Sequence, residues 1–411
     1  MSGSLLVRRG GSGKWIADVC IVGGGGHVGL PLGLMFAGKG RKVLLHDLNH
    51  AALRIIAAGK VPFMEKGAEG LLRRVLKRDL LRVASHPRPI AGVPTVIVTI
   101  GTPVDAFLNP MMKVIRGCVN RLLPYLSSGQ LLVLRSTVYP GTTAWLDRYL
   151  QSKGRQMMVA FCPERVVQGC SLDEIPRFPQ IVGATTPAAE LAADRLFHAI
   201  VPETVHLSPL EAEFAKLFGN AHRYIQFAIA NQLYMIATSA GVDYGRILDG
   251  MRHNYPRARD IPRAGFTAGP CLFKDTMQLA AFSGNHFSLG HAAMFINEGL
   301  VLYLVNEIAR KHELEKLTVG LLGMAFKADN NDTRGSLSYK LKKTLTCRAK
   351  RVLTTDPHVM DDPDCRPLQS VIAESDLLIL CVPHGAYRGI DTKGRPVVDV
   401  WNCLGKGTRV P

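Results

Sequence analysis

The chain has 411 residues, of which 47% are apolar and 20% are charged, and its formal net charge is +17. A chain of this length exceeds what one hydrophobic core usually supports, so two or three domains are expected. The composition is ordinary for a soluble globular enzyme.

The cysteines and the basic residues narrow the function classes further. Nine cysteines are spread along the chain without a CxxC pair, which argues against a disulfide framework or a zinc site and for reduced thiols in the cytoplasm. No apolar run approaches the roughly 18 residues that a membrane span needs. The basic residues are dispersed in short groups such as Arg73-Arg74 and Lys342-Lys343, without a basic arm interleaved with aromatic residues. A small anionic ligand is therefore favoured over nucleic acid.

The first half of the chain alternates strands and helices. Between residues 17 and 47 an apolar strand, a glycine cluster, an apolar helix and a second apolar strand follow one another, which predicts a βαβ unit. Further buried strands are expected at 95–100, 131–134 and 157–161, with helical patterns between them. This alternation predicts a Rossmann-like, doubly wound parallel sheet.

The pattern changes near Ser208. Residues 209–240 contain apolar side chains at intervals of three and four, which predicts one long helix, and further helices follow up to about residue 316. Strands return at residues 317, 351, 377 and 396. We therefore expect a Rossmann-like domain at 1–206, an all-helical central domain at 207–316, and a second, smaller Rossmann-like domain at 317–411.

The glycine cluster carries the first functional signal. Gly24, Gly26 and Gly29 lie between a predicted strand and a predicted helix, and Asp47 ends the next strand. Glycines permit a tight turn and the close approach of a pyrophosphate, which the helix N-terminus attracts, and the acid accepts hydrogen bonds from ribose hydroxyls. An acid rather than an arginine at this strand end favours NAD over NADP.

Seven collinear motifs give the sequence a specific resemblance. They are Val28-Gly-Leu-Pro31, Gly101-Thr-Pro103, Ser136-Thr-Val-Tyr-Pro-Gly-Thr-Thr143, Cys162-Pro-Glu-Arg165, Glu213-Phe-Ala-Lys216 with Asn220, Cys271 with Lys274-Asp275, and Gly323-Met-Ala-Phe-Lys327 with Asp332-Thr-Arg334. Together they resemble the UDP-glucose/GDP-mannose dehydrogenase family, and the resemblance extends from residue 18 to residue 402. It implies an NAD-dependent, four-electron oxidation of the C6 alcohol of a nucleotide sugar to the uronate, in a homodimer built on the long central helix.

The resemblance also implies roles for individual residues. Cys271 would attack the intermediate aldehyde and carry it as a thiohemiacetal and then a thioester. Lys216 and Asn220, which share one helix face because they lie four apart, would stabilise the developing oxyanion. Asp275 would orient or activate the hydrolytic water. The catalytic set is completed by Glu164, as base or as holder of substrate hydroxyls, and by Thr137, which would contact water or the cofactor.

The remaining implied contacts are to the cofactor and the substrate. The cofactor set adds His27, Val28, Thr102, Thr137, Lys274 and Arg334 to the glycines and Asp47. The substrate set contains Glu164, Arg165, Lys216, Asn220, Arg257 and Lys327. Within it, Arg257 resembles an arginine that reaches the sugar bound by a neighbouring subunit.

Two departures from the family pattern bear on the site. Ala268-Gly-Pro270 replaces the usual residues before the cysteine, and proline removes a backbone N–H there. Gln168 stands where UDP-glucose enzymes carry a second glutamate, and an amide does not act as a general base.

The substrate indications are divided, and two rival readings stay open. Glu164-Arg165 and Asn254-Tyr-Pro-Arg257 favour a UDP-N-acetylhexosamine such as UDP-ManNAc or UDP-GlcNAc, whereas Lys274-Asp275 favours UDP-glucose. A one-step dehydrogenase of the hydroxyacid type shares the first two domains but not the third. A non-catalytic nucleotide-sugar binding protein is the alternative outside the enzymes.

Overall fold

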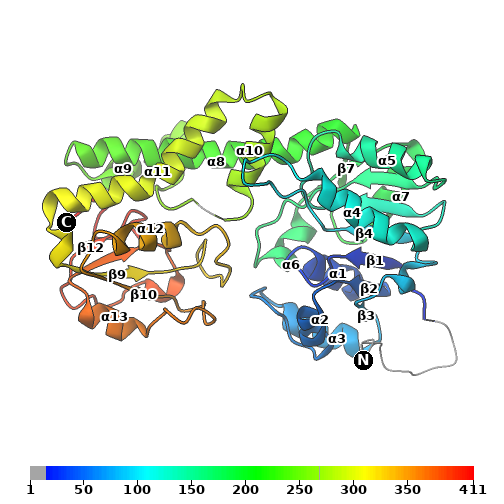
Figure 1. Ribbon diagram of the computed structural model, residues 1–411, viewed down its shortest axis with the longest axis horizontal. Helices are drawn as coiled ribbons and strands as arrows, with labels where there is room; N and C mark the ends of the chain where they lie inside the picture. The colour runs from blue at the N-terminus through cyan, green and yellow to red at the C-terminus, as the bar shows by residue number, and fades with distance from the viewer. Residues whose placement is uncertain (1–14, 268) are drawn as a thin grey trace. The chain divides into compact units, whose positions relative to one another are not determined.

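The computed structural model describes residues 15–267 and 269–411, so the first fourteen residues and Ala268 lie outside the described part. The chain divides into two compact units (Figure 1), the first ending at Phe218 and the second beginning at Gly219. This division falls within the long helix α8 (Pro209–Ser239).

The first unit contains an eight-stranded sheet with the order β3-β2-β1-β4-β5-β6-β7-β8. Its strands are β1 (Val19–Val22), β2 (Val43–His46), β3 (Leu81–Ala84), β4 (Thr95–Val98), β5 (Leu131–Leu134), β6 (Met158–Phe161), β7 (Gln180–Ala184) and β8 (Thr204–Leu207). The first six are parallel and have the strand order of a dinucleotide-binding fold. The predicted Rossmann-like sheet is thus confirmed.

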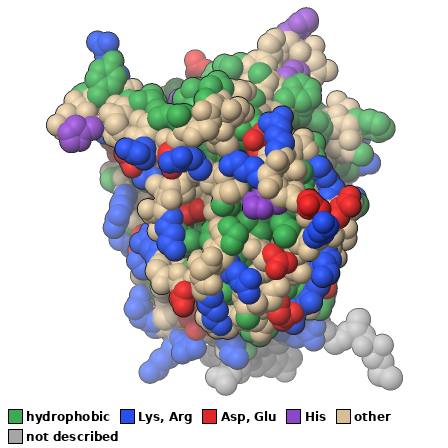
Figure 2. All heavy atoms as spheres, turned by 90° about the vertical axis from the view of Figure 1, so that its left-hand side faces the viewer, with side chains coloured by type: hydrophobic (Ala, Val, Ile, Leu, Met, Phe, Trp, Pro, Cys, Tyr) green, Lys and Arg blue, Asp and Glu red, His purple; other side chains and the backbone are tan. Residues whose placement is uncertain are grey.

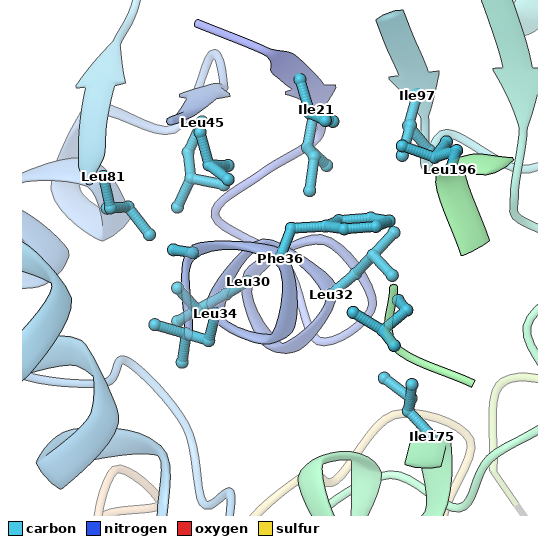
Figure 3. Packing of buried hydrophobic residues seen from close by; sticks show 14 of the residues in the cluster. Ile21, Leu30, Leu32, Leu34, Phe36, Leu45, Leu81, Ile97, Ile175 and Leu196 are labelled. Carbon is cyan, nitrogen blue, oxygen red and sulfur yellow. The ribbon is translucent and has the colours of Figure 1, made fainter. Parts of the chain in front are cut away.

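Alternate residues of each strand enter two separate cores, one on each face of the sheet. Ile21, Leu45 and Ile97 point to the side of α1 (Gly29–Gly38), whose Leu30, Leu32 and Phe36 pack below them (Figure 3). Their neighbours Cys20, Leu44 and Val96 point to the other side, which α4 (Met112–Leu122) and α5 (Thr142–Ser152) cover. Because both faces are buried, these strands are apolar throughout rather than alternating.

Three strands had no clear signal in the sequence. In β3 an arginine interrupts the apolar run, and β8 is a largely exposed edge strand. β7 pairs antiparallel with β6, so the sheet departs from the purely parallel arrangement at this edge. The remaining helices of this unit are α2 (His50–Ala57), α3 (Ala68–Lys77), α6 (Ser171–Glu174) and α7 (Pro187–Phe197).

The second unit combines helices with a small parallel sheet of order β10-β9-β11-β12. The predicted long helix is confirmed as α8 and is followed by α9 (Tyr244–Arg252), α10 (Leu272–Phe282) and α11 (Ser288–Lys311). The sheet and its helices are β9 (Thr318–Leu322), α12 (Leu337–Thr346), β10 (Arg351–Thr355), α13 (Leu368–Glu374), β11 (Leu377–Leu380) and β12 (Val397–Val398). The predicted second α/β unit is therefore present.

Helix α11 corrects one expectation. By length and composition alone this helix is apolar enough to cross a membrane. From the sequence we expected no segment with that length and composition. However, its residues Leu300, Val301, Leu304 and Val305 are buried in the core that also contains Leu321 of β9. Burial therefore accounts for the apolar side chains on one side of α11, whereas Leu289, Phe295 and Leu302 of the same helix are exposed.

Candidate active site

The loop after β1 has the shape that a dinucleotide requires. A Cβ atom at Gly24 would lie 2.7 Å from the Cβ of Leu45, and one at Gly29 would lie 2.4 Å from the carbonyl oxygen of Gly23. At Gly26 the nearest such atom is 3.5 Å away, so the absent side chain leaves the loop surface open. Because α1 begins at Gly29, the positive end of its dipole lies at this surface, as pyrophosphate binding needs. The loop therefore fits NAD.

Asp47 is fixed directly after β2. Its Oδ2 accepts a hydrogen bond from the backbone N–H of Gly25 at 2.8 Å, and its Oδ1 accepts one from Asn49 at 2.9 Å. These bonds tie the acidic strand end to the glycine loop. Nearby, the ring of His27 stacks on Phe63 with centroids 4.1 Å apart, which gives the predicted cofactor residue a defined side-chain position.

Two further loops meet at the carboxyl ends of β4 and β5. The N–H of Thr102 donates to the carbonyl of Thr137 at 3.2 Å, and the hydroxyl of Ser136 donates to the carbonyl of Thr99 at 2.6 Å. β1 and β4 are neighbours where the strand order reverses, and ligands of such sheets bind in the crevice outside this point. The structure thus places Thr102 and Thr137 together at the position expected for a bound cofactor.

Glu164 forms a largely buried ion pair with Arg135. Its Oε2 accepts from Nη2 and Nε of Arg135 at 2.7 and 3.1 Å, and its Oε1 accepts from the N–H groups of Arg165 and Val166. Burial is the largest single effect and raises the pKa of the Glu164 carboxyl, but the charge of Arg135, the hydrogen bonds from Val166 and Arg135, and the charge of Lys216 together lower the pKa below its usual value. The hydrogen bonds and the neighbouring positive charges thus favour the ionised form of this carboxylate and fix its orientation.

Glu213 connects helix α8 to the Thr137 loop. Its carboxylate is buried and accepts from the N–H of Gly141 at 2.6 Å and from the N–H of Thr143 at 2.8 Å, at the N-terminus of α5. Because Lys216 lies three residues further along α8, the same contact sets the position of that lysine.

The predicted residues of the second unit converge on one buried carboxylate. Asp275 is fully buried, and its Oδ2 accepts from Nδ2 of Asn220 at 2.6 Å while its Oδ1 accepts from Nζ of Lys274 at 2.5 Å. The N–H of Asp275 donates to the carbonyl of Cys271 at 2.9 Å. Cys271 is exposed at the N-cap of α10, so an accessible thiol lies one helical turn from an ionic cluster.

The backbone before Cys271 is shaped by contacts within the second unit. Gly269 has φ of +108°, and a Cβ atom there would lie 2.5 Å from the ring of Phe326. Its N–H donates to the carbonyl of Gly335 at 3.2 Å. Pro270 precedes the helix N-cap, where a missing N–H removes no helical hydrogen bond. The departure from the family pattern is therefore compatible with the local fold.

Arg334 lies near Cys271 but is held by another partner. Its Nη2 contacts Oδ2 of Asp332 at 2.6 Å, and Asp332 together with Cys271 raises the pKa of the guanidinium. The expectation that Arg334 binds the cofactor stays a prediction, because its observed neighbours belong to the cysteine region. A positive charge in this place favours the thiolate form of a nearby cysteine.

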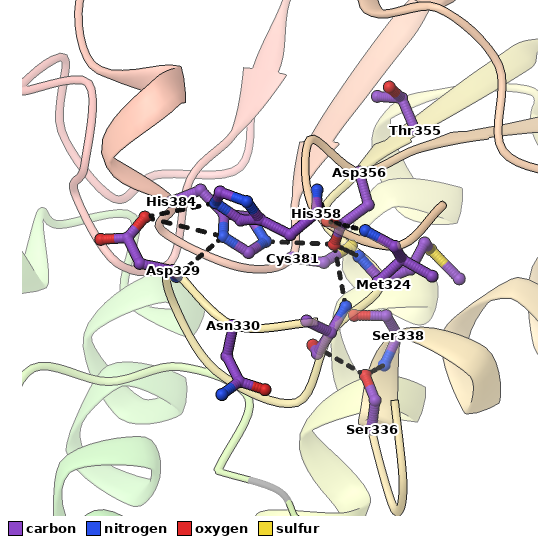
Figure 4. Close-up of polar contacts among 12 residues, drawn as sticks. Met324, Asp329, Asn330, Ser336, Ser338, Thr355, Asp356, His358, Cys381 and His384 are labelled. Carbon is purple, nitrogen blue, oxygen red and sulfur yellow. Dashed lines mark hydrogen bonds and ion pairs between the residues drawn. The ribbon is translucent and has the colours of Figure 1, made fainter. Parts of the chain in front are cut away.

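A polar network at the carboxyl end of the small sheet was not anticipated (Figure 4). Oδ2 of Asp356 accepts from the N–H groups of Met324 and Ala325, at 2.6 and 2.9 Å, and lies 3.1 Å from Nε2 of His384. Nδ1 of His384 accepts from the N–H of Asp329 at 2.9 Å. The network ties the loops after β9, β10 and β11 together and thereby fixes the loop that carries Lys327.

Asp329, His358 and His384 are close enough to be considered as metal ligands, with the potential ligand atoms within 4.8 Å of one another. However, Nδ1 of His384 already accepts the Asp329 N–H, and Oδ1 of Asp329 accepts the N–H of Gly385 at 2.8 Å. These hydrogen bonds occupy two of the three potential ligand atoms. We therefore assign the group to the loop network and assign no metal site to it.

Three further predicted substrate residues have different surroundings. Arg165 is directed to the carbonyl of Pro179, and Nζ of Lys327 lies 6.0 Å from the ring of Phe326. Arg257 is exposed in a short 3-10 helix. Their roles toward the sugar nucleotide stay predictions, as does the consequence of Gln168.

The glycine loop, the acid at the end of β2 and the reversal of strand order between β1 and β4 define a dinucleotide-dependent oxidoreductase. Comparison with known families narrows this class. The sequence matches the NAD binding domain of the UDP-glucose/GDP-mannose dehydrogenase family at residues 17–201, its central domain at 210–299 and its UDP binding domain at 320–406. The chain belongs to this family, and it is an NAD-dependent nucleotide-sugar dehydrogenase.

Individual relatives are similar to this chain over nearly their whole length. The UDP-N-acetyl-D-mannosamine dehydrogenase of Pyrococcus horikoshii is 26% identical over 396 residues, which are 93% of this chain and 91% of that protein. The NDP-N-acetyl-D-galactosaminuronic acid dehydrogenase of Ralstonia nicotianae is 26% identical and covers 91% and 93%. Among solved structures, a UDP-glucose dehydrogenase from Pyrobaculum islandicum has a TM-score of 0.86 at 26% identity and covers 96% and 95% of the two chains.

Proposed function

We propose that this chain oxidises the C6 alcohol of a UDP-N-acetylhexosamine to the uronate in two successive steps, with Cys271 as the nucleophile. The observation that carries the proposal is the arrangement around Asp275. An exposed thiol lies at the N-cap of α10, and one turn further a buried carboxylate is held between Asn220 and Lys274. A one-step dehydrogenase needs no such thiol.

Bound NAD would accept one hydride in each of the two oxidations, and a second NAD molecule would replace the NADH that the first oxidation forms. Gly24, Gly26, Gly29 and Asp47 would hold each NAD in turn, and Thr102 and Thr137 would line the same crevice. The Cys271 sulfur adds to the carbonyl carbon of the aldehyde, forming a C–S bond, and the resulting thiohemiacetal loses its hydride to become a thioester. Water then cleaves the C–S bond, which releases the carboxylate and returns the thiol.

The other residues would bind and polarise the reacting groups. The ammonium of Lys216 and the amide of Asn220 stabilise the oxygen on which negative charge develops. Asp275 orients the attacking water, while Glu164, as a fixed anion, accepts hydrogen bonds from sugar hydroxyls. Arg165, Arg257 and Lys327 are proposed to bind the sugar nucleotide.

The proposed substrate class is supported by the names of relatives. Relatives named as UDP-N-acetyl-D-mannosamine dehydrogenases and NDP-N-acetyl-D-galactosaminuronic acid dehydrogenases share the length of this chain. UDP-glucose is the second candidate, because the Lys274–Asp275 ion pair is present and a UDP-glucose dehydrogenase has a similar structure.

The proposal extends to location and assembly. A cytoplasmic enzyme agrees with nine free thiols. A homodimer built on α8 is supported by the exposed Phe218, Ile229 and Ile236 of this helix, because exposed apolar side chains at helical spacing often mark an interface. The division into domains at 1–206, 207–316 and 317–411 remains part of this proposal. On the face shown in Figure 2, Lys and Arg side chains are spread among acidic and apolar ones, as suits a small anionic ligand.

NAD reduction with a panel of UDP- and GDP-sugars tests the proposed function. We expect turnover with UDP-ManNAc or UDP-GlcNAc and formation of the uronate. Preferential turnover of UDP-glucose would support the second candidate. Binding of a sugar nucleotide without NADH formation from any member of the panel would contradict the enzymatic assignment.

A further inference from the structure

Arg135 is a buried arginine beside Glu164, and the sequence motifs give it no role. It follows β5 directly, and its side chain is only 2% exposed. An arginine is rarely buried to this degree unless its charge is paired. The question is therefore what the buried guanidinium does for the site.

The contacts of Arg135 divide into two kinds. Nη2 and Nε both donate to Oε2 of Glu164, at 2.7 and 3.1 Å. Nη1 donates to the carbonyl of Cys162 at 3.1 Å and contacts the side-chain oxygen of Gln180. The first kind fixes a proposed substrate ligand, whereas the second connects the ends of β6 and β7.

The carboxylate of Glu164 is surrounded by positive charge. Arg135 faces it from the end of β5, Lys216 acts on it from α8, and Arg165 follows it in its own loop. Its Oε1 is occupied by two backbone N–H groups, from Arg165 and Val166. Every strong contact of this side chain thus favours one rotamer and the ionised form.

We propose that Arg135 is a positioning residue of the substrate site, which holds Glu164 as an oriented anion next to Lys216. This inference rests on the proposed function, since it takes Glu164 to contact the sugar nucleotide. It adds that Arg135 fixes both the orientation and the ionised state in which Glu164 accepts hydrogen bonds from the sugar hydroxyls.

Substitutions of Arg135 separate charge from geometry. Arg135→Lys keeps the positive charge but loses the two-point fork. Arg135→Met removes both. We expect kcat/KM for the sugar nucleotide to fall about 100-fold in Arg135→Met, the scale of a misplaced reacting group, while the KM for NAD stays within about threefold. In Arg135→Lys the loss should be smaller, and the pH dependence should resemble that of the wild type.

A double-mutant cycle distinguishes this role from a purely structural one. If Arg135 acts through Glu164, adding Arg135→Met to the Glu164→Gln variant should lower kcat/KM by less than about threefold relative to Glu164→Gln alone. If Arg135 only connects β6 and β7, the loss should be equal in both backgrounds, and the inference would be wrong. Gln180→Leu is the matched control, because it removes the structural contact and should leave the pH profile of kcat/KM unchanged.

A measurement without turnover decides the point even if the proposed function fails. The glutamate carboxyl carbons of ¹³C-labelled protein can be titrated by NMR, with the Glu164 signal assigned from Glu164→Gln. Its pKa should rise in Arg135→Met, because burial persists while a cation is lost, and should change little in Arg135→Lys. Identical titrations in wild type and Arg135→Met would overturn the inference, whereas wild-type protein that forms no NADH would refute only the proposed function.

Discussion

The glycine loop permits a comparison of two substitutions that differ only in the space available. In Gly29→Ala the new methyl group would lie 2.4 Å from the Gly23 carbonyl oxygen and 2.8 Å from the Gly24 Cα. Both are backbone atoms, which do not rotate away as a side chain would. In Gly26→Ala the nearest atom is 3.5 Å away, which is an ordinary contact, and Gly26 is not in the left-handed region.

The two substitutions should therefore affect different properties, the stability of the fold in one variant and NAD binding in the other. Forcing the backbone apart at Gly29 should lower the free energy of unfolding by about 1–3 kcal/mol, the usual cost of overpacking. Gly26→Ala should leave stability unchanged or raise it by about 0.4–1 kcal/mol, since alanine restricts the unfolded chain. Yet its methyl group projects from the open surface of the loop and should weaken NAD binding about 10-fold or more, which corresponds to about 1.4 kcal/mol.

Chemical denaturation and NAD titration by fluorescence measure the two effects separately. Equal stabilities of Gly29→Ala and the wild type would refute the close approach of Gly29 to Gly23. A Gly26→Ala variant with unchanged NAD affinity would contradict the placement of the cofactor on this loop.

Three further predictions concern the thiol and two buried carboxylates. Cys271→Ser should stall during or after the first oxidation, so that less than two NADH form per sugar, and unchanged turnover would exclude Cys271 as the nucleophile. Asp356 has a pKa lowered from 3.8 to about 2 against the opposing effect of burial, mainly by His384. It should stabilise the fold by about 2 kcal/mol above pH 3.8, a contribution lost as the pH falls towards 2, and pH-dependent unfolding of Asp356→Asn should lack this loss. Glu213→Ala leaves the buried N–H groups of Gly141 and Thr143 unpaired and should cost about 1–3 kcal/mol per group in the free energy of unfolding, which chemical denaturation of the variant and the wild type measures; an unchanged free energy would contradict the role of this carboxylate.

The sequence was sufficient to predict the elements that depend on a local pattern of residues. The apolar strands β1, β2, β4, β5 and β6, the glycine loop and the helix α8 each have a periodicity or composition that identifies them. The sequence did not identify β7 and β8, because an edge strand buries little and its direction depends on pairing partners far away in the chain. The expectation that no segment is long and apolar enough for a membrane span did not hold for α11, and which of its side chains are buried depends on tertiary packing.

The predicted site residues were recognised from motifs, but their partners were not. Glu164 was interpreted as a base or as a holder of substrate hydroxyls, and both stay predictions, whereas its ion pair with Arg135, which follows a different strand, was not foreseen. The sequence did offer one signal for this ion pair. Arg135 follows the apolar run of β5 directly, and a charged side chain so close to a buried sheet needs a partner of opposite charge. Asp356 and His384 follow two different strands and lie 20 or more residues apart, so no local sequence pattern predicts their contact.

The stoichiometry of NADH formation tests the central claim most directly. Purified wild-type protein is incubated with a limiting amount of UDP-N-acetylhexosamine and excess NAD, and both NADH and the sugar product are quantified. The account predicts two NADH per sugar nucleotide and a uronate as the product. One NADH per sugar nucleotide together with a free aldehyde would contradict it.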